Sequence, residues 1–184
     1  MEKLALAKVY RYIEPGPVMM VSTLVEGRPN LMTMSITIVI DDNDPPLIGC
    51  GIGPWDYSYA GLRSSGECVL AIPTVELMEK VVEIGNCSGR DVDKFSQYGL
   101  TPAPAEKVDA PLVAECLVNL ECRVAETSLV EKYNLFIVKV VQAWIDTQHQ
   151  ERRFFHHNGD GTFTVDGETI DLKAKMGKWP SYIA

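Results

Sequence analysis

The sequence lacks several features that would point to a membrane, secreted or nucleic-acid-binding protein. No apolar run approaches the ~20 residues that span a bilayer, and Met1 to Ala5 lacks the basic start of a signal peptide. Basic residues are outnumbered, because 17 lysines and arginines face 25 acidic residues and give a formal net charge of −8. Such a charge repels nucleic acid and anionic lipid. We expect a cytoplasmic protein that binds neither nucleic acid nor membrane.

Cysteine and histidine are present, but not in the patterns of metal sites or disulfide frameworks. The five cysteines are an odd number without a Cys-x-x-Cys pair, which argues against a zinc ribbon and a disulfide framework. Cys68, Cys116 and Cys122 fall in strand-like segments, where a free thiol usually behaves as a small buried hydrophobe. The chain has three histidines, the adjacent pair His156-His157 and His149. We therefore expect no metal site.

The sequence does contain a series of apolar strand-like runs, separated by glycine, proline and asparagine. The residue pattern predicts a strand over 18–25, a turn over 26–30 and a hairpin partner over 31–40. Further strands are predicted from residue 47 to Ile52, before Pro54, and within 67–73. Helices are predicted over 58–65 with Gly66 as the stop, over 74–85, and from an Asp91 cap through Gln97. The apolar side of the second helix would carry Val75, Met78 and Val82.

The second half of the chain continues the strand pattern. Over 114–124 apolar residues alternate with Glu115, Asn119, Glu121 and Arg123, which predicts a half-buried strand. The run 135–144 is apolar on both parities, so we expect it to be buried on both sides or to lie at a subunit contact. Three Asn-Gly or Asp-Gly turns predict an exposed hairpin over 154–172. The basic-aromatic tail 173–184 would be an arm on a partner subunit. Together these features predict one domain, 1–184, with a core over about 12–146 and a hairpin and tail over 147–184.

The glycines at 49, 51 and 53 imitate a dinucleotide-binding fingerprint. The next glycine of that fingerprint is replaced by Pro54, and no long amphipathic helix follows at once, so we reject a Rossmann interpretation. Glycines in this position either permit a bend or let a flat ring approach the backbone. Cys50, between two of them, either tunes a cofactor or simply packs.

An ordered set of short motifs carries a resemblance to a known family. They are Asn30-Leu-Met-Thr-Met-Ser35, Pro45-Pro46, Tyr57-Ser-Tyr59, Gly66-Glu-Cys-Val-Leu-Ala-Ile-Pro73, Ser88-Gly-Arg-Asp-Val-Asp-Lys-Phe95, Gly99-Leu-Thr-Pro102 and the segment 110–123. In this order and spacing, over roughly 12–146, the chain resembles the flavin reductase-like FMN-binding split barrels, in particular the flavoredoxin branch. The resemblance implies a mainly β fold, an antiparallel split β-barrel with peripheral helices.

The resemblance also implies a site for flavin mononucleotide (FMN). It places Met32, Thr33, Met34 and Ser35 along the flavin ring and ribityl chain, and Cys50, Gly51, Ser58 and Tyr59 towards the ribityl chain and phosphate. Hydroxyl, amide and cationic groups that can reach an anion are supplied by Ser88, Gly89, Arg90 and Lys94, although this loop can also be read as a solvated charge run.

Three positions depart from the family pattern. Asp56 stands where flavoredoxins commonly carry an arginine, and Leu70-Ala71 replaces a Val-Asn pair. Lys132-Tyr133-Asn134 replaces a Gly-x-His motif that is linked to nicotinamide in many flavin reductases.

The function that the resemblance implies is a homodimeric oxidoreductase that passes electrons through noncovalently bound FMN. The electron donor would be NAD(P)H or a redox protein, and no side chain would be needed as acid or base. Two alternatives stay open: a noncatalytic FMN electron carrier, and a flavin-binding or sensing module without turnover.

Overall fold

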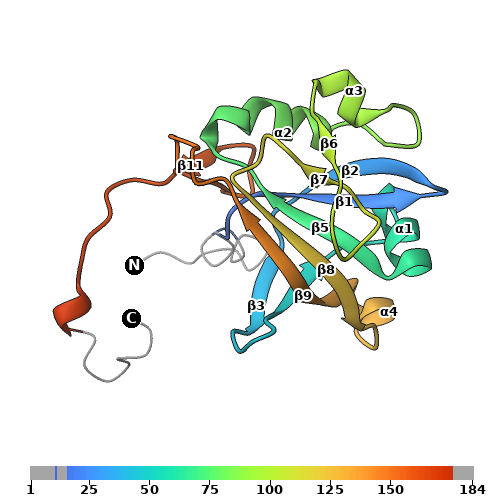
Figure 1. Ribbon diagram of the computed structural model, residues 1–184, viewed down its shortest axis with the longest axis horizontal. Helices are drawn as coiled ribbons and strands as arrows, with labels where there is room; N and C mark the ends of the chain where they lie inside the picture. Colours follow the sequence, from blue (N-terminus) through green and yellow to red (C-terminus); the bar gives the residue numbers. More distant parts are fainter. Residues whose placement is uncertain (1–10, 12–15, 176–184) are drawn as a thin grey trace, which may run out of the picture.

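The computed structural model describes Arg11 and residues 16–175, and its main feature is a seven-stranded antiparallel sheet (Figure 1). The strand order is β2-β1-β5-β8-β9-β4-β3. The strands are β1 (Met19–Val25), β2 (Arg28–Met34), β3 (Thr37–Asp41), β4 (Leu47–Gly51), β5 (Glu67–Ile72), β8 (Val118–Glu126) and β9 (Leu135–Ile145). Although β2 and β3 lie at opposite ends of this order, only Ser35 and Ile36 separate them in the chain. The sheet must therefore curl until its two edges meet, which gives the predicted split barrel.

The prediction of one strand over 31–40 is wrong, because the chain leaves one edge strand and enters the other within this segment. β2 pairs with β1, whereas β3 pairs with β4. The predicted turn over 26–30 is also shorter in the structure. Glu26 and Gly27 have φ values of 51° and 75°, typical of a two-residue hairpin turn, and Arg28 already pairs with Val25.

The barrel strands are buried on both faces where helices cover them. Met19 and Val21 of β1 lie in the cluster inside the barrel, while Val18 and Met20 belong to a second cluster outside it. The second cluster joins β1 and β2 to α2 (Met78–Gly85) and α3 (Lys94–Tyr98), through residues such as Ile84. These two helices therefore lie against the outer face of the barrel, next to β2 (Figure 1).

The helices follow the predictions except in their details. Helix α1 (Tyr57–Ser65) ends at Gly66, as predicted. Gly66 has a left-handed φ of 68°, and its N–H donates to the carbonyl of Leu62. The helix predicted over 74–85 begins as a 3₁₀ turn, η2 (Val75–Leu77), and its buried residues are Val81 and Ile84, not the predicted apolar face. The cap of α3 is Asp93 rather than Asp91, because the Asp93 carboxylate accepts from the N–H of Ser96. Two further short helices are described, α4 (Val130–Tyr133) and η3 (Lys173–Lys175).

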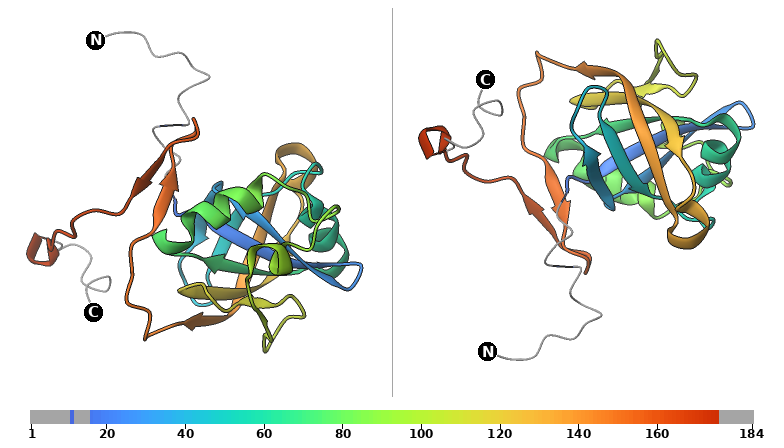
Figure 2. Two further views of the ribbon diagram at one scale, coloured as in Figure 1. Left: turned by 90° about the horizontal axis from the view of Figure 1, so that it is seen from above. Right: turned by 90° about the horizontal axis from the view of Figure 1, so that it is seen from below.

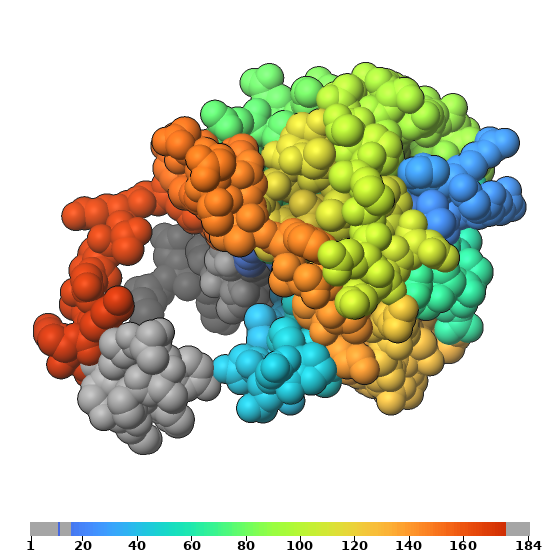
Figure 3. All heavy atoms as spheres, viewed as in Figure 1, coloured from blue at the N-terminus to red at the C-terminus, as the bar shows by residue number. Residues whose placement is uncertain are grey.

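The predicted polar face of the strand over 114–124 is wrong, because two of its residues are buried. Asn119 and Glu121 of β8 are 6% and 0% exposed. The segment between α3 and β8, which contains the small sheet β6 (Pro102–Ala103) and β7 (Leu112–Val113), lies at the surface (Figure 3), and its backbone N–H groups donate to both side chains. The Glu121 carboxylate accepts from the N–H groups of Glu106 and Lys107, and from the indole of Trp144 at 2.7 Å. This covering segment, which directly precedes β8 in the chain, thus folds back over the strand and turns a polar face into a second interior.

Strand β9 lies between β8 and β4, and its inner face is buried in the barrel at Phe136, Val138 and Val140. On the other parity, only Val141 packs under the covering segment, and Ile145 is exposed. Burial on both sides is therefore confined to part of this strand.

A hairpin follows the barrel, as predicted, with strands β10 (Phe155–His157) and β11 (Phe163–Val165). The expectation that it is exposed is wrong for Phe155, which is fully buried in the outer cluster. After β11 the chain runs away from the barrel (Figure 2). Of the arm predicted over 173–184, the structure describes only Lys173–Lys175, and the aromatic part, Trp179 to Tyr182, lies outside the described residues.

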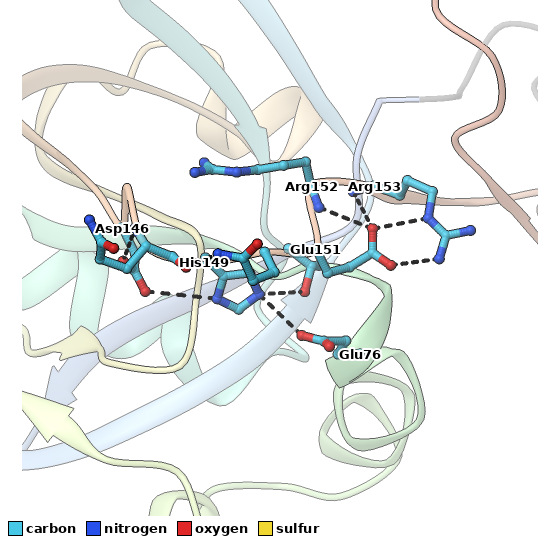
Figure 4. Close-up of polar contacts among 9 residues, drawn as sticks. Glu76, Asp146, His149, Glu151, Arg152 and Arg153 are labelled. Atoms are coloured by element: carbon cyan, nitrogen blue, oxygen red, sulfur yellow. Dashed lines mark hydrogen bonds and ion pairs between the residues drawn. The ribbon is translucent and has the colours of Figure 1, made fainter.

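The link between β9 and the hairpin is held against η2, the 3₁₀ turn that leads into α2, through His149 (Figure 4). Its Nε2 lies 3.2 Å from a Glu76 carboxylate oxygen and 3.3 Å from the Thr74 hydroxyl, and its Nδ1 lies 3.8 Å from Asp146. Nearby, the N–H of Val75 donates to the carbonyl of Arg153. These contacts explain how the hairpin is held next to α2.

Candidate functional site

A polar cavity of about 240 Å³ lies between β2, the start of α1 and the loop that joins α2 to α3. Each of the three segments contributes one wall, and Lys94 from the start of α3 adds a cation. The lining residues are Asn30, Leu31, Met32, Thr33, Trp55, Asp56, Tyr57, Ser58, Gly85, Asn86, Cys87, Ser88, Gly89 and Lys94. We call it the anion cavity, because its polar groups and the buried ammonium of Lys94 are suited to bind an anion.

Asn30 and Ser58 join the β2 wall to the α1 wall. The Asn30 amide donates to the Ser58 hydroxyl at 2.7 Å, and both residues are buried. The other amide atom of Asn30, Oδ1, is buried and has no hydrogen-bond partner among the described residues. A buried polar atom without a partner is costly, so it indicates a missing ligand or water.

Gly89 brings the third wall against this amide. A Cβ built on Gly89 would lie 1.7 Å from Asn30 Oδ1, well inside the contact distance of real atoms. The loop can approach Asn30 this closely only because residue 89 has no side chain.

Lys94 supplies a buried positive charge. It is only 4% exposed, and its ammonium donates to the carbonyl of Ile84 at 2.8 Å. An ammonium has three donors, and two of them have no partner within the described part of the chain, so they remain for a ligand. Burial lowers the pKa of Lys94, and the nearby Cys87 and Asp56 act in the opposite direction. A buried cation with spare donors is suited to bind an anion.

Asp56 places a negative charge in the same cavity. Its carboxylate does not cap α1, but accepts from the N–H of Gly53 at 2.9 Å. The family resemblance led us to expect an arginine at this position. The charge of Asp56 opposes any anion bound by Lys94, so the cation of the cavity is partly offset.

A second, more open cavity of about 210 Å³ adjoins the first. The two share Thr33, Gly85 and Asn86, and the Thr33 hydroxyl donates to the carbonyl of Val81, which ties β2 to α2. The second cavity is also lined by Val18, Ser35, Val82, His157 and Phe163. The His157 and Phe163 rings, paired across the hairpin, have centroids 5.2 Å apart. The hairpin thus completes a depression whose wall is mainly apolar.

Half of the residues predicted for the site meet at the anion cavity. Met32, Thr33, Ser58, Ser88, Gly89 and Lys94 all line it, and Ser35 lines the second cavity. They come from three separate elements, so the fold brings together what the sequence spreads over 63 positions.

The other predicted residues lie elsewhere. Met34 and Cys50 point into the barrel core, where burial raises the pKa of Cys50 to about 12. The Ile36 side chain lies over Gly51, and Tyr59 packs edge-on against Phe136. Arg90 is exposed, with its guanidinium carbon 5.5 Å from the centre of the Tyr57 ring. None of these side chains lines either cavity.

Sequence reasoning missed several lining residues, above all Asn30, Trp55, Asn86 and Cys87. Asn30 opened a quoted motif, but the sequence placed it in the predicted turn over 26–30, so its burial in β2 could not be recognised. The other three lie in turns, where the sequence gives no sign of which way a side chain points. The Lys132–Asn134 segment lies at α4, apart from α2 and α3 (Figure 1).

Within the described part of the chain, no three histidine, cysteine or acidic residues are grouped so that they could hold a metal ion. No helix there is long and apolar enough to cross a membrane.

The fold and comparisons with known proteins define the family. The chain matches the flavin reductase like domain over residues 10–163 and belongs to that family. Its fold is the FMN-binding split barrel of the flavin reductase-like proteins.

Two solved structures and one relative show the extent of the similarity. An FMN-binding domain of a flavin reductases-like enzyme from Shewanella baltica is 27% identical, with a TM-score of 0.79 over 92% of this chain and 95% of that one. A flavoredoxin from Methanosarcina acetivorans is 25% identical, with a TM-score of 0.81 over 97% and 98%. An uncharacterized protein from Archaeoglobus fulgidus is 31% identical over 136 residues, 74% of this chain and 76% of its own.

Proposed function

We propose that this protein is an oxidoreductase that binds FMN noncovalently, with the FMN phosphate in the anion cavity. The observation that carries the proposal is the ammonium of Lys94, 4% exposed and with two spare donors, in a polar cavity of an otherwise acidic protein. Burying a cation is costly unless something compensates it. A phosphate dianion would provide that compensation.

The residues of the cavity fit a phosphate group. Lys94 would hold it by charge, and the hydroxyls of Ser58 and Ser88 would add neutral donors. Asn30 can also become a donor. A half-turn of the Asn30 amide presents the NH₂ group in place of Oδ1, and the Ser58 hydroxyl then donates its single proton to Oδ1, so that Asn30 replaces Ser58 as the donor to the phosphate.

The adjoining second cavity fits the rest of the cofactor. Thr33 borders both cavities, while Val18 and Phe163 give the second one the apolar wall that a flat ring needs. Ligand pockets typically enclose ~300–1,000 Å³, more than either cavity alone but compatible with both together. The cofactor would supply the electron chemistry, and the chain would orient the ring, limit access of water and neutralise the phosphate.

The flavin content can be tested directly. The purified protein should be yellow and release FMN, not FAD, on denaturation. Apo-protein should bind added FMN at micromolar concentration and riboflavin, which has no phosphate, more weakly. A colourless protein that does not bind added FMN would overturn the proposal.

Turnover separates the oxidoreductase from the two noncatalytic alternatives. We infer NAD(P)H or a redox protein as the electron donor, and steady-state NAD(P)H oxidation with free FMN as acceptor distinguishes them. Oxidation over many turnovers supports the reductase, whereas reduction of the bound flavin by a protein donor alone supports the carrier. A flavin that neither donor reduces supports the sensing module.

We further propose that the functional unit is a homodimer. The edge strand β3 and its approach expose Ile36, Ile38, Val39 and Ile40, each between 44% and 65%. A long, exposed, apolar edge strand is a liability unless another chain covers it. The exposed apolar surface that could form a subunit contact therefore lies on β3, and not on β9, where the sequence predicted it.

The oligomeric state tests this proposal. Light scattering should show a dimer, and an Ile38→Lys variant should be monomeric. A wild-type monomer with bound FMN would contradict the proposal.

A further inference from the structure

Cys87 is the one cysteine of this chain that lines the anion cavity. The other four cysteines are at most 3% exposed, whereas Cys87 is only partly buried and lines the anion cavity. Burial raises the pKa of Cys50 and Cys116, and a contact with Cys122, together with burial, raises that of Cys68. These three thiols are therefore protonated and out of reach of reagents.

The position of Cys87 is fixed by the same group that fixes Lys94. The Cys87 thiol donates to the carbonyl of Ile84 at 3.7 Å, and the Lys94 ammonium donates to the same oxygen at 2.8 Å. The sulfur also lies 3.4 Å from the Tyr98 hydroxyl. The thiol and the buried cation thus share one acceptor, so a group added to the sulfur would enter the space next to Lys94.

The cavity itself carries an independent sign of a ligand. Asn30, 4% exposed, lines it with a buried amide oxygen that has no partner among the described residues. This sign does not depend on the cysteine. It shows that the wall of the cavity which Cys87 borders carries a buried polar atom with unfilled hydrogen-bonding capacity.

We propose that Cys87 is a modification site within the anion cavity, and that an electrophile or hydroperoxide reacting with its sulfur closes the cavity to the phosphate of FMN. The proposal rests on the function proposed above and adds a way to control it. In an alkylation by iodoacetamide, a sulfur–carbon bond forms, the carbon–iodine bond breaks, and the thiol proton leaves with iodide. With hydrogen peroxide, a sulfur–oxygen bond forms and the oxygen–oxygen bond breaks. The sulfur is oxidised to the sulfenic acid and the peroxide is reduced to water.

The test compares the five cysteines of the native, full-length protein. Apo-protein is treated with iodoacetamide, and the labelled fraction of each cysteine is followed over time by peptide mass spectrometry. Cys87 should be labelled at least about tenfold faster than the other four, because they are inaccessible. Saturating FMN should slow the labelling of Cys87 by at least about tenfold, because the cofactor would cover the thiol.

The labelled protein is then titrated with FMN. Labelling should weaken FMN binding at least about tenfold, since the added group would occupy the space beside the cation. A Cys87→Ser protein is the matched control: whatever affinity it has should be the same before and after iodoacetamide. Treatment with hydrogen peroxide should give the same pattern, and a thiol reductant should restore binding.

The outcomes separate this proposal from the proposed function. If Cys87 is labelled no faster than the buried cysteines, or if labelled protein binds FMN as tightly as before, the modification site is overturned while FMN binding stands. If the untreated protein binds no FMN, the proposed function fails. Protection of Cys87 by inorganic phosphate then decides whether the thiol borders an anion site: protection supports that part, and its absence overturns it.

Discussion

The Lys94 ammonium donates a 2.8 Å hydrogen bond to the carbonyl oxygen of Ile84, which joins the first residue of α3 to the last turn of α2. Carbonyls in the last turn of a helix lack partners within the helix, so this lysine satisfies one of them. The bond also holds the ammonium inside the anion cavity. Arg90, only four residues earlier, instead lies over the Tyr57 ring and is exposed. Two cations that the sequence makes equal candidates for a phosphate are thus in very different environments.

We predict that Lys94→Ala weakens FMN binding much more than Arg90→Ala does. A charge-assisted bond shielded from water contributes ~1–3 kcal/mol, which corresponds to roughly 5- to 150-fold in Kd. An exposed cation contributes at most ~1 kcal/mol. Titrations of apo-protein, followed by flavin fluorescence, would measure both, with riboflavin as the ligand without phosphate and the exposed Lys107→Ala as control. If Lys94→Ala lost FMN and riboflavin equally, Lys94 would not bind the phosphate.

The affinity for FMN should fall as the pH rises, and should begin to fall below the ordinary lysine pKa of 10.5. Burial lowers the pKa of Lys94, so the folded apo-protein releases this proton at a lower pH than the unfolded chain does. At a pH between the pKa of Lys94 in the folded protein and its pKa in the unfolded chain, the unfolded chain binds more protons than the folded protein. The free energy of unfolding of apo-protein therefore rises with pH in this range. In the same window the cavity loses its cation.

This pH dependence has a direct control. In Lys94→Arg the charge is permanent, so the fall in FMN affinity should disappear over the same range. Riboflavin affinity should change little in either protein. A fall that persisted in Lys94→Arg would show that another group is responsible.

Asp56→Asn should tighten FMN binding. The substitution removes a negative charge from the cavity wall, while the amide oxygen can still accept from the N–H of Gly53. A unit charge near a dianion in a partly solvated site changes the binding energy by ~1 kcal/mol, or roughly 2- to 10-fold in Kd, and less at high salt. Asp91→Asn, an exposed acidic residue of the neighbouring loop, is the control. Equal or weaker affinity for Asp56→Asn would mean that this carboxylate does not face the phosphate.

The strands that could be predicted are those set by local pattern. An apolar run between turn residues suffices to find 18–25 and the strand at 67–72, because each is bounded by its own glycine or proline. The break at Ser35–Ile36 has no such signal. It arises where the barrel closes, which depends on strands far away in the sequence.

The same distinction explains the site. Ser58, Ser88 and Lys94 could be named because their residue types suit a phosphate and the resemblance places them. The sequence could not show that Cys50 and Tyr59 lie outside the cavity. A residue of β4 or α1 faces either the core or the cavity, depending on how the element packs, and these two face the core. The burial of Glu121 likewise depends on a covering segment that no local pattern reveals.

Glu121→Gln should destabilise the fold. Burial alone would raise the pKa of Glu121, but the indole of Trp144 and the N–H groups of Glu106, Lys107 and Val108 together lower it. The resulting stability is present above the ordinary pKa of 4.5 and is lost as the pH falls through the lower folded value. Glutamine has one acceptor oxygen and leaves a buried donor without a partner, which costs ~1–3 kcal/mol.

Chemical denaturation near neutral pH would measure this loss. The matched control is Glu115→Gln, whose partly exposed side chain accepts from the N–H of Thr101 at 3.0 Å. Its cost should stay within ~0.5 kcal/mol, because water can replace the lost bond. Similar losses in the two variants would show that the covering segment does not bury Glu121.

Gly89→Ala should damage the anion cavity even though it adds only one methyl group. The new Cβ would lie 1.7 Å from Asn30 Oδ1 and 3.1 Å from the Tyr57 ring, so the loop must withdraw or the Asn30–Ser58 bond must break. Such overpacking typically costs ~1–3 kcal/mol, and FMN affinity should fall at least several-fold because two cavity walls separate.

Gly167→Ala is the matched control for this variant, because a Cβ there meets nothing within 4 Å. Isothermal titration with FMN and thermal unfolding of both apo-proteins would show whether the effects are confined to position 89. The added methyl group must displace the loop from Asn30. If Gly89→Ala nevertheless bound FMN as tightly as Gly167→Ala, the contact between this loop and Asn30 would not be part of the phosphate site.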